Sequence, residues 1–184
     1  MDAKKKINQF IGPNWIPGII MIILFPLAIF GLFYLLFIAL PRSNTAKRNL
    51  EKLEENGQLE QAAAELTSQN AKQYMDGKLV LTDHFVFCKK TGQIYTYDEF
   101  VWIYRHTFTQ RFFLIPVKVT ESLYASTTIA KTGKPSQALP IASMGKDTMD
   151  QIKNAIIEIY NHNKNCMIGY SDQNVAAHKQ MLKK

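Results

Sequence analysis

The chain has 184 residues, a formal net charge of +7 and only two cysteines, Cys88 and Cys166. Two widely spaced cysteines argue against a small scaffold held together by disulfides, and they suit a reducing compartment. A net charge this modest is typical of ordinary solubilising surface charge, and no nucleic-acid partner is expected.

The segment from Ile16 to Leu40 carries no charged side chain. As one helix it would reach roughly 37 Å, enough to cross a hydrocarbon core of about 30 Å with some tilt. It is longer than the apolar region of a signal peptide and ends without a small-residue cleavage pattern. We therefore expect a short tail over 1–15 and a single transmembrane helix over 16–40, with Pro26 as a bend.

Basic residues flank this segment on both sides, and they set the expected orientation. Three precede it and four follow it: Lys4, Lys5, Lys6, Arg42, Lys47, Arg48 and Lys52. The excess of positive charge on the C-terminal flank favours a cytoplasmic C-terminal part. The sequence thus predicts a single-pass protein of the cell membrane with the lipid bilayer as one partner.

Residues 41–71 read as a helical connector next to the bilayer. Ser43, Asn44 and Thr45 offer N-cap side chains for a helix from about Ala46, and Gly57 is placed to end it. A second helix is predicted where Leu59, Ala62, Ala63 and Leu66 follow the spacing of one apolar stripe.

From residue 78 the pattern changes to short strands. Apolar runs at 78–82 and 85–88, then 93–96, 101–108, 117–120 and 122–132, are separated by turn residues, and 138–142 is expected to pair back after Gly133. Asp147 is expected to cap a long helix from Thr148, whose buried stripe is Met149, Ile152, Ile156 and Ile159. Residues 72–184 are therefore predicted to form an α+β domain, an antiparallel β-roll closed by a C-terminal amphipathic helix.

The order of these parts resembles a known family. The runs KLVLTDHFVF, YTYDEFVWIY and DTMDQIKNAIIEIY, with the preceding ENGQLEQAAAEL, are similar to a family of Gram-positive bacterial single-pass membrane proteins with a pleckstrin-homology-like (PH-like) domain. The resemblance implies the fold and membrane attachment, and no catalytic mechanism. Relatives of this fold bind phosphoinositides through basic residues in early strand turns, and Lys89 and Lys90 lie in a comparable turn.

No residue pattern indicates catalysis, a metal or a cofactor. Cys88 could pair with His84 or His106, but a nucleophilic thiol also needs an activating environment and an oriented base. His162 and Cys166 are four residues apart without a third or fourth ligand. Ser143 and Lys146 match the spacing of Ser-x-x-Lys in a turn rather than on a helix.

The candidate binding residues are basic or aromatic. Possible contacts to an anionic surface are Lys89, Lys90, Arg105 and Arg111. Phe112 and Phe113, which follow a predicted strand, form either the next core strand or a loop that contacts a partner or a membrane surface.

The sequence therefore predicts a membrane-anchored, non-enzymatic interaction or scaffold module at the inner face of the cell membrane, with a protein partner. Two alternatives stay open. One is a membrane-anchored enzyme that uses Cys88 or a histidine, and the other is an accessory subunit of a larger membrane complex.

Overall fold

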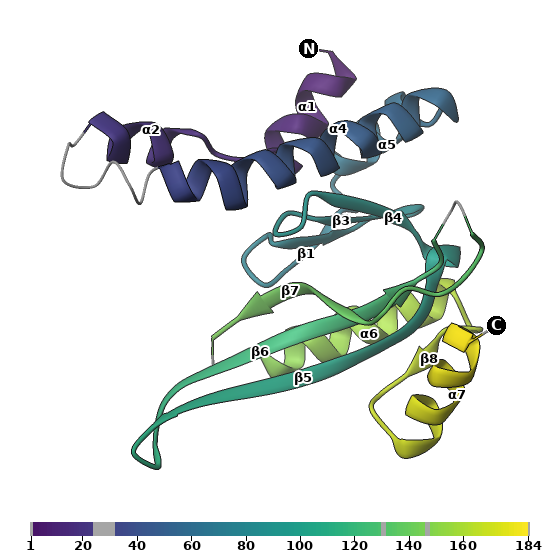
Figure 1. The fold of residues 1–184 in the computed structure, drawn as a ribbon. Helices are drawn as coiled ribbons and strands as arrows, with labels where there is room; N and C mark the ends of the chain where they lie inside the picture. The colour runs from purple at the N-terminus through teal and green to yellow at the C-terminus, as the bar shows by residue number, and fades with distance from the viewer. Residues whose placement is uncertain (1, 24–31, 130–131, 146–147, 184) are drawn as a thin grey trace. The chain divides into compact units, whose positions relative to one another are not determined.

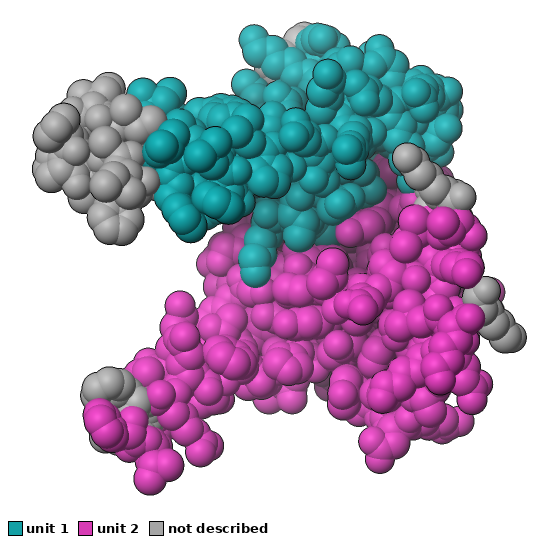
Figure 2. Space-filling model, viewed as in Figure 1, with its two compact units in different colours: residues 1–70, 87–94 teal, residues 71–86, 95–184 magenta. Residues whose placement is uncertain are grey.

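The computed structural model describes residues 2–23, 32–129, 132–145 and 148–183, and its architecture is α+β (Figure 1). The chain divides into two compact units (Figure 2). Unit 1 comprises residues 1–70 and 87–94, and unit 2 comprises residues 71–86 and 95–184. The division falls inside two strands, β3 (Phe85–Cys88) and β4 (Gln93–Thr96).

Unit 1 is mainly helical. Within the described residues, its helices are α1 (Ala3–Ile11), α2 (Ile16–Ile23), the π-helix η2 (Leu35–Ala39), α4 (Leu40–Glu55) and α5 (Leu59–Leu66). Helix α1 packs against α4 and α5 and buries Ala3, Ile7 and Ile11. The core of unit 1 therefore forms where the N-terminal helix meets the connector helices.

The connector is a helical pair, as predicted. Gly57 adopts a φ of +66° after α4, the Gly57 N–H donates to the Glu54 carbonyl, and the Gln58 N–H donates to the Leu53 carbonyl. These two bonds form the Schellman motif that glycine favours at a helix end. The predicted start near Ala46 is wrong, because α4 already begins at Leu40, and the Thr45 hydroxyl bonds the Pro41 carbonyl instead of capping the helix.

The predicted transmembrane helix over 16–40 is contradicted. Within the described ranges, no helix is both long enough and apolar enough to cross a bilayer. Helix α2 covers eight residues, and α4 is polar from Arg42 onward. Pro26 lies outside the described residues, so the predicted bend there is not addressed.

The packing of unit 1 gives a physical reason for this correction. Arg42 Nε donates to the Ile11 carbonyl at 2.9 Å, although a single crossing would hold these two residues on opposite sides of about 30 Å of hydrocarbon. The expected placement as a single-pass protein of the cell membrane is therefore wrong. The cytoplasmic orientation inferred for the C-terminal part depended on that predicted span, so it loses its basis.

The strands form two four-stranded sheets. The first has the order β1-β2-β3-β4, where β1 (Lys72–Tyr74) pairs antiparallel with β2 (Leu79–Leu81). The second has the order β7-β6-β5-β8, formed by β5 (Phe100–Phe112), β6 (Ile115–Thr127), β7 (Leu139–Met144) and β8 (Met167–Ile168). Strands β5, β6 and β7 are antiparallel, whereas β8 runs parallel to β5.

The long strands of the second sheet differ from the predicted short ones. The pieces expected at 117–120 and 122–132 belong largely to one strand, β6, which pairs with β5 almost along its whole length. The predicted return after Gly133 is confirmed, because β7 pairs with β6. In Figure 1 the β5–β6 hairpin extends well beyond helix α6 as an arm.

Helix α6 (Met149–His162) packs on β5 and β6 and buries Ile152, Ala155 and Ile159. Its N-cap is Thr148, and Asp147 lies outside the described residues. A further helix, α7 (Asp172–Lys183), follows β8. The expectation of one roll closed by a final helix is thus wrong in two respects, because there are two sheets and α6 is not the last element.

Candidate functional site

A groove lies in unit 2 along the part of helix α6 that the sheet leaves uncovered. It encloses about 650 Å³ and is lined by Arg105, Met149, Lys153, Ile156, Ile157, Ile168, Gly169 and Tyr170. This volume lies within the range typical of ligand pockets, about 300–1,000 Å³. Met149 and Ile156 were predicted to be core, but Met149 is 50% exposed and Ile156 lines the groove.

The wall of the groove opposite α6 comes from the segment after β8. The Gly169 N–H donates to the Ile103 carbonyl at 2.9 Å, and Trp102 Nε1 donates to the Gly169 carbonyl at 2.8 Å. Gly169 has a φ of +80°, which residues with a side chain rarely adopt, and this conformation turns the chain immediately after β8. Tyr170 is thereby placed with its ring 5.9 Å from Trp102 and 5.1 Å from Tyr104.

The charge on this groove is positive. Arg105 on β5 and Lys153 on α6 both line it, and none of the described residues that line it is acidic. The other lining side chains are apolar or aromatic, with Ile157 46% and Ile168 45% exposed. The groove therefore combines an apolar surface with two cations, which suits a ligand that is both apolar and anionic.

The tip of the β5–β6 arm is a second unusual surface. Phe112 pairs with Ile115, so Phe113 and Leu114 form a two-residue turn with φ values of +46° and +70°. This is the geometry for which hairpins usually use Asn-Gly. The side chains of Phe113 and Leu114 are 86% and 87% exposed. Phe112 thus ends strand β5, whereas Phe113 and Leu114 form a turn and not a core strand. The predicted contact of this segment with a partner or a membrane surface stays a prediction.

The four predicted basic contacts are divided between the two units. Lys89 and Lys90 belong to the turn between β3 and β4 in unit 1, where Lys89 Nζ lies 5.6 Å from the centre of the Phe10 ring. Arg105 and Arg111 lie on β5 in unit 2. Only Arg105 joins the groove, whereas Arg111 is exposed near the tip of the arm.

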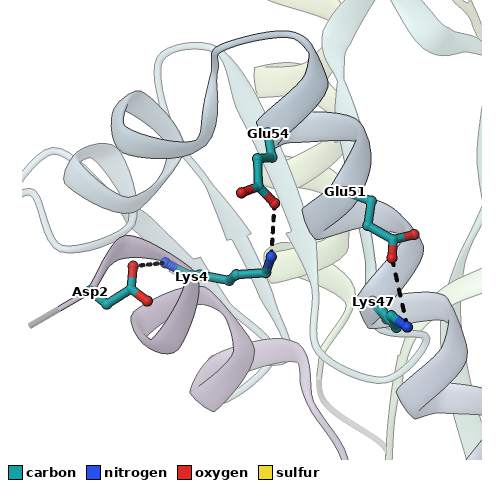
Figure 3. Close-up of polar contacts among 5 residues, drawn as sticks. All are labelled: Asp2, Lys4, Lys47, Glu51 and Glu54. Carbon is teal, nitrogen blue, oxygen red and sulfur yellow. Dashed lines mark hydrogen bonds and ion pairs between the residues drawn. The ribbon is translucent and has the colours of Figure 1, made fainter.

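A second pocket lies between α1 and α4 and encloses about 460 Å³. It is lined by Asp2, Lys4, Lys5, Asn8, Ser43, Lys47 and Leu50. Lys4 pairs with Glu54 at 2.8 Å and Lys47 pairs with Glu51 at 3.8 Å (Figure 3). Because carboxylates already compensate two of its three lysines, this pocket is a weaker anion site than its composition suggests.

The cysteines and histidines considered for chemistry do not form a reactive group. Burial raises the pKa of the Cys88 thiol, and burial also raises the pKa of Cys166, to about 12. Both thiols therefore stay protonated at neutral pH, which disfavours nucleophilic attack. His162 bonds the Glu158 carbonyl through Nδ1 and stacks on Tyr97 at 4.1 Å. No group of three metal-ligating side chains occurs in the described part of the chain.

A buried polar cluster that the sequence did not indicate holds α7 to the second sheet. His178 Nε2 lies 2.8 Å from the Ser126 hydroxyl, which donates to the Ser136 carbonyl at 2.7 Å. Ser126 is completely buried and His178 is 5% exposed. A substrate cannot reach this pair, so its contribution is to anchor α7. No spacing in the sequence links residues so far apart.

Comparison with known proteins identifies no relative: no protein-family model, no curated protein and no solved structure matches this chain. The function is therefore argued from the geometry of these surfaces.

Proposed function

We propose that this protein is a non-enzymatic interaction module whose unit 2 binds an acidic, apolar segment of a protein partner in the groove along α6. The observation that carries the proposal is the composition of this groove, whose lining is apolar or aromatic except for the two cations Arg105 and Lys153. Amphipathic helices bind such grooves by placing apolar side chains at intervals of three and four residues against the floor.

Two features support a binding role over catalysis. The groove is lined by α6 and by the backbone-anchored segment around Gly169, so it is formed without a partner. Preformed sites bind with a smaller entropic cost than flexible ones. In addition, the raised pKa values of Cys88 and Cys166 disfavour both thiols as nucleophiles, which weakens the alternative of a thiol-dependent enzyme.

The preference for acidic partners follows from the two cations. An apolar segment that also carries Glu or Asp would place carboxylates near Arg105 and Lys153, whereas a basic segment would repel them. Such complementarity mainly decides which partner is accepted, while the apolar contacts contribute most of the affinity. Arg105 was also a residue at which the sequence predicted an anionic contact.

The test uses two fluorescent amphipathic peptides of about four helical turns with identical apolar positions, one carrying Glu and the other Lys on the flanks. Fluorescence anisotropy with the full chain should show tighter binding of the Glu peptide. In the double variant Arg105→Glu with Lys153→Glu, the preference should reverse. A variant that retains the wild-type preference would refute the assignment of the groove.

The matched control is Lys134→Glu with Lys179→Glu, which changes the net charge equally at exposed residues outside the groove lining. This control should keep the preference for the Glu peptide. A reversal in the control as well would mean that the overall charge of the protein, and not this groove, selects the peptide.

A further inference from the structure

The apolar segment 16–40 of unit 1 begins and ends close to one place in this unit. Arg42 Nε donates to the Ile11 carbonyl at 2.9 Å, and the Tyr34 hydroxyl donates to the Asn14 carbonyl at 2.9 Å. The first bond joins the chain before the segment to the chain after it, and the second joins the chain before the segment to a residue within it. Helices α1 and α4, which carry the two flanks, also pack against each other. Both ends of the segment are therefore held together, on the same side of any layer that the segment enters.

The described part of this segment exposes an unusual number of large apolar side chains. Those that are 37–63% exposed are Trp15, Ile16, Ile19, Ile20, Leu32, Phe33, Leu36, Phe37, Ile38 and Leu40. The sequence has no charged residue between Lys6 and Arg42. Many large apolar side chains exposed on neighbouring helices mark a site that another apolar surface covers.

The residues at the base of the segment follow the layers of a bilayer surface. Trp15 lies where the chain enters the segment, as amphipathic rings do at the level of lipid headgroups. The flanking helices α1 and α4 carry the exposed basic residues Lys5, Lys47 and Arg48, of which Lys47 pairs with Glu51. Basic side chains in this position are attracted to anionic headgroups.

We propose that the described apolar residues between α1 and α4, within 15–23 and 32–40, insert into an anionic lipid surface from one side, without crossing it. A protein partner fits less well, because protein interfaces combine an apolar centre with a polar rim of hydrogen-bonding groups. Here the only polar side-chain atom between Ile16 and Leu40 is the Tyr34 hydroxyl, which already donates to the Asn14 carbonyl.

The first experiment measures insertion with the full chain and vesicles of phosphatidylcholine with or without phosphatidylserine. Trp15 should be quenched by lipids brominated near the headgroup, and the protein should float with acidic vesicles. The variant Trp15→Phe retains only Trp102, which is 4% exposed, and should lose the quenching. Ile19→Glu with Phe37→Glu, at exposed positions, should weaken vesicle binding at least about tenfold because two apolar contacts become charged.

The second experiment tests the one-sided geometry. In a variant with both native cysteines replaced by alanine, a single cysteine is placed at Asn8 or at Ser43, on the two flanks. With sealed vesicles and an impermeant maleimide, both positions should react from the outside. Protection of only one flank would overturn the proposal in favour of a crossing. Absence of flotation, or a stable dimer that buries the segment without lipid, would overturn it in favour of a protein surface.

Discussion

Replacing Phe113 and Leu114 by Asn and Gly is expected to stabilise unit 2. Both residues adopt positive φ, at +46° and +70°. A left-handed conformation costs an L-residue roughly 1–2 kcal/mol, and Gly avoids this cost. The side chains are 86% and 87% exposed, so their removal sacrifices little buried apolar surface.

The net gain can be worked from these terms. Relief of about 2 kcal/mol over the two positions is reduced by about 0.5–1 kcal/mol, the extra conformational entropy that Gly gives the unfolded chain. The free energy of unfolding should therefore rise by about 1–1.5 kcal/mol. With a urea dependence of about 2 kcal/mol per molar, the midpoint of denaturation at 25 °C should increase by about 0.5–0.8 M.

The matched control is Phe113→Ala with Leu114→Ala. It removes the same exposed side chains but keeps a Cβ at both positive-φ positions, so its midpoint should stay close to that of the wild type. A midpoint for the Asn-Gly variant that is unchanged or lower would refute the assignment of strain to this turn. Equal gains in both variants would assign the effect to the exposed apolar side chains instead.

Two further outcomes are expected. Asn163→Ala should lower the free energy of unfolding by about 2 kcal/mol in urea denaturation, because Asn163 Nδ2 donates to the Tyr97 and Phe100 carbonyls at 2.9 and 3.0 Å. The control Asn161→Ala, at an exposed residue, should cost less than about 0.5 kcal/mol, and equal losses in the two variants would refute this role of Asn163. Burial raises the pKa of Cys166 from 9.0 to about 12, so the contribution of this thiol to stability should be complete below pH 9 and should decline as the pH rises toward 12. The urea midpoint of Cys166→Ala should therefore decline less steeply over that range than the midpoint of the wild type. Identical pH profiles of the two proteins would contradict the raised pKa.

The local elements were predictable because their signals are local. The α5 stripe, the glycine after α4 and the strands at β2 and β3 depend on spacing and turn residues within a few positions, and all four are present. Strand β8 and helix α7 were missed for a related reason. Met167 and Ile168 are too short a run to show alternation, and their pairing partner lies more than sixty residues earlier.

The groove could be predicted only in part. Arg105 was a candidate for its basic charge, but Met149 and Ile156 were assigned to the core because an apolar stripe does not reveal how much of it the sheet covers. One signal was available in the sequence. The adjacent pair Ile156 and Ile157 widens the stripe beyond what one sheet face needs, and Lys153 lies on the preceding turn.

The error over residues 16–40 shows where hydropathy stops being informative. Hydropathy measures whether a segment avoids charge, and it contains nothing about where the two ends of that segment lie. Their position is decided by contacts between distant residues, here the bond between Arg42 and the Ile11 carbonyl and the packing of α1 against α4. These contacts require Ile7 and Ile11 on one face of a nine-residue helix, which lies within the stretch predicted to be a tail. The same apolar composition therefore fits a crossing when the ends are separate and a one-sided insertion when they are joined, so the buried face of α1 is the feature that distinguishes the two.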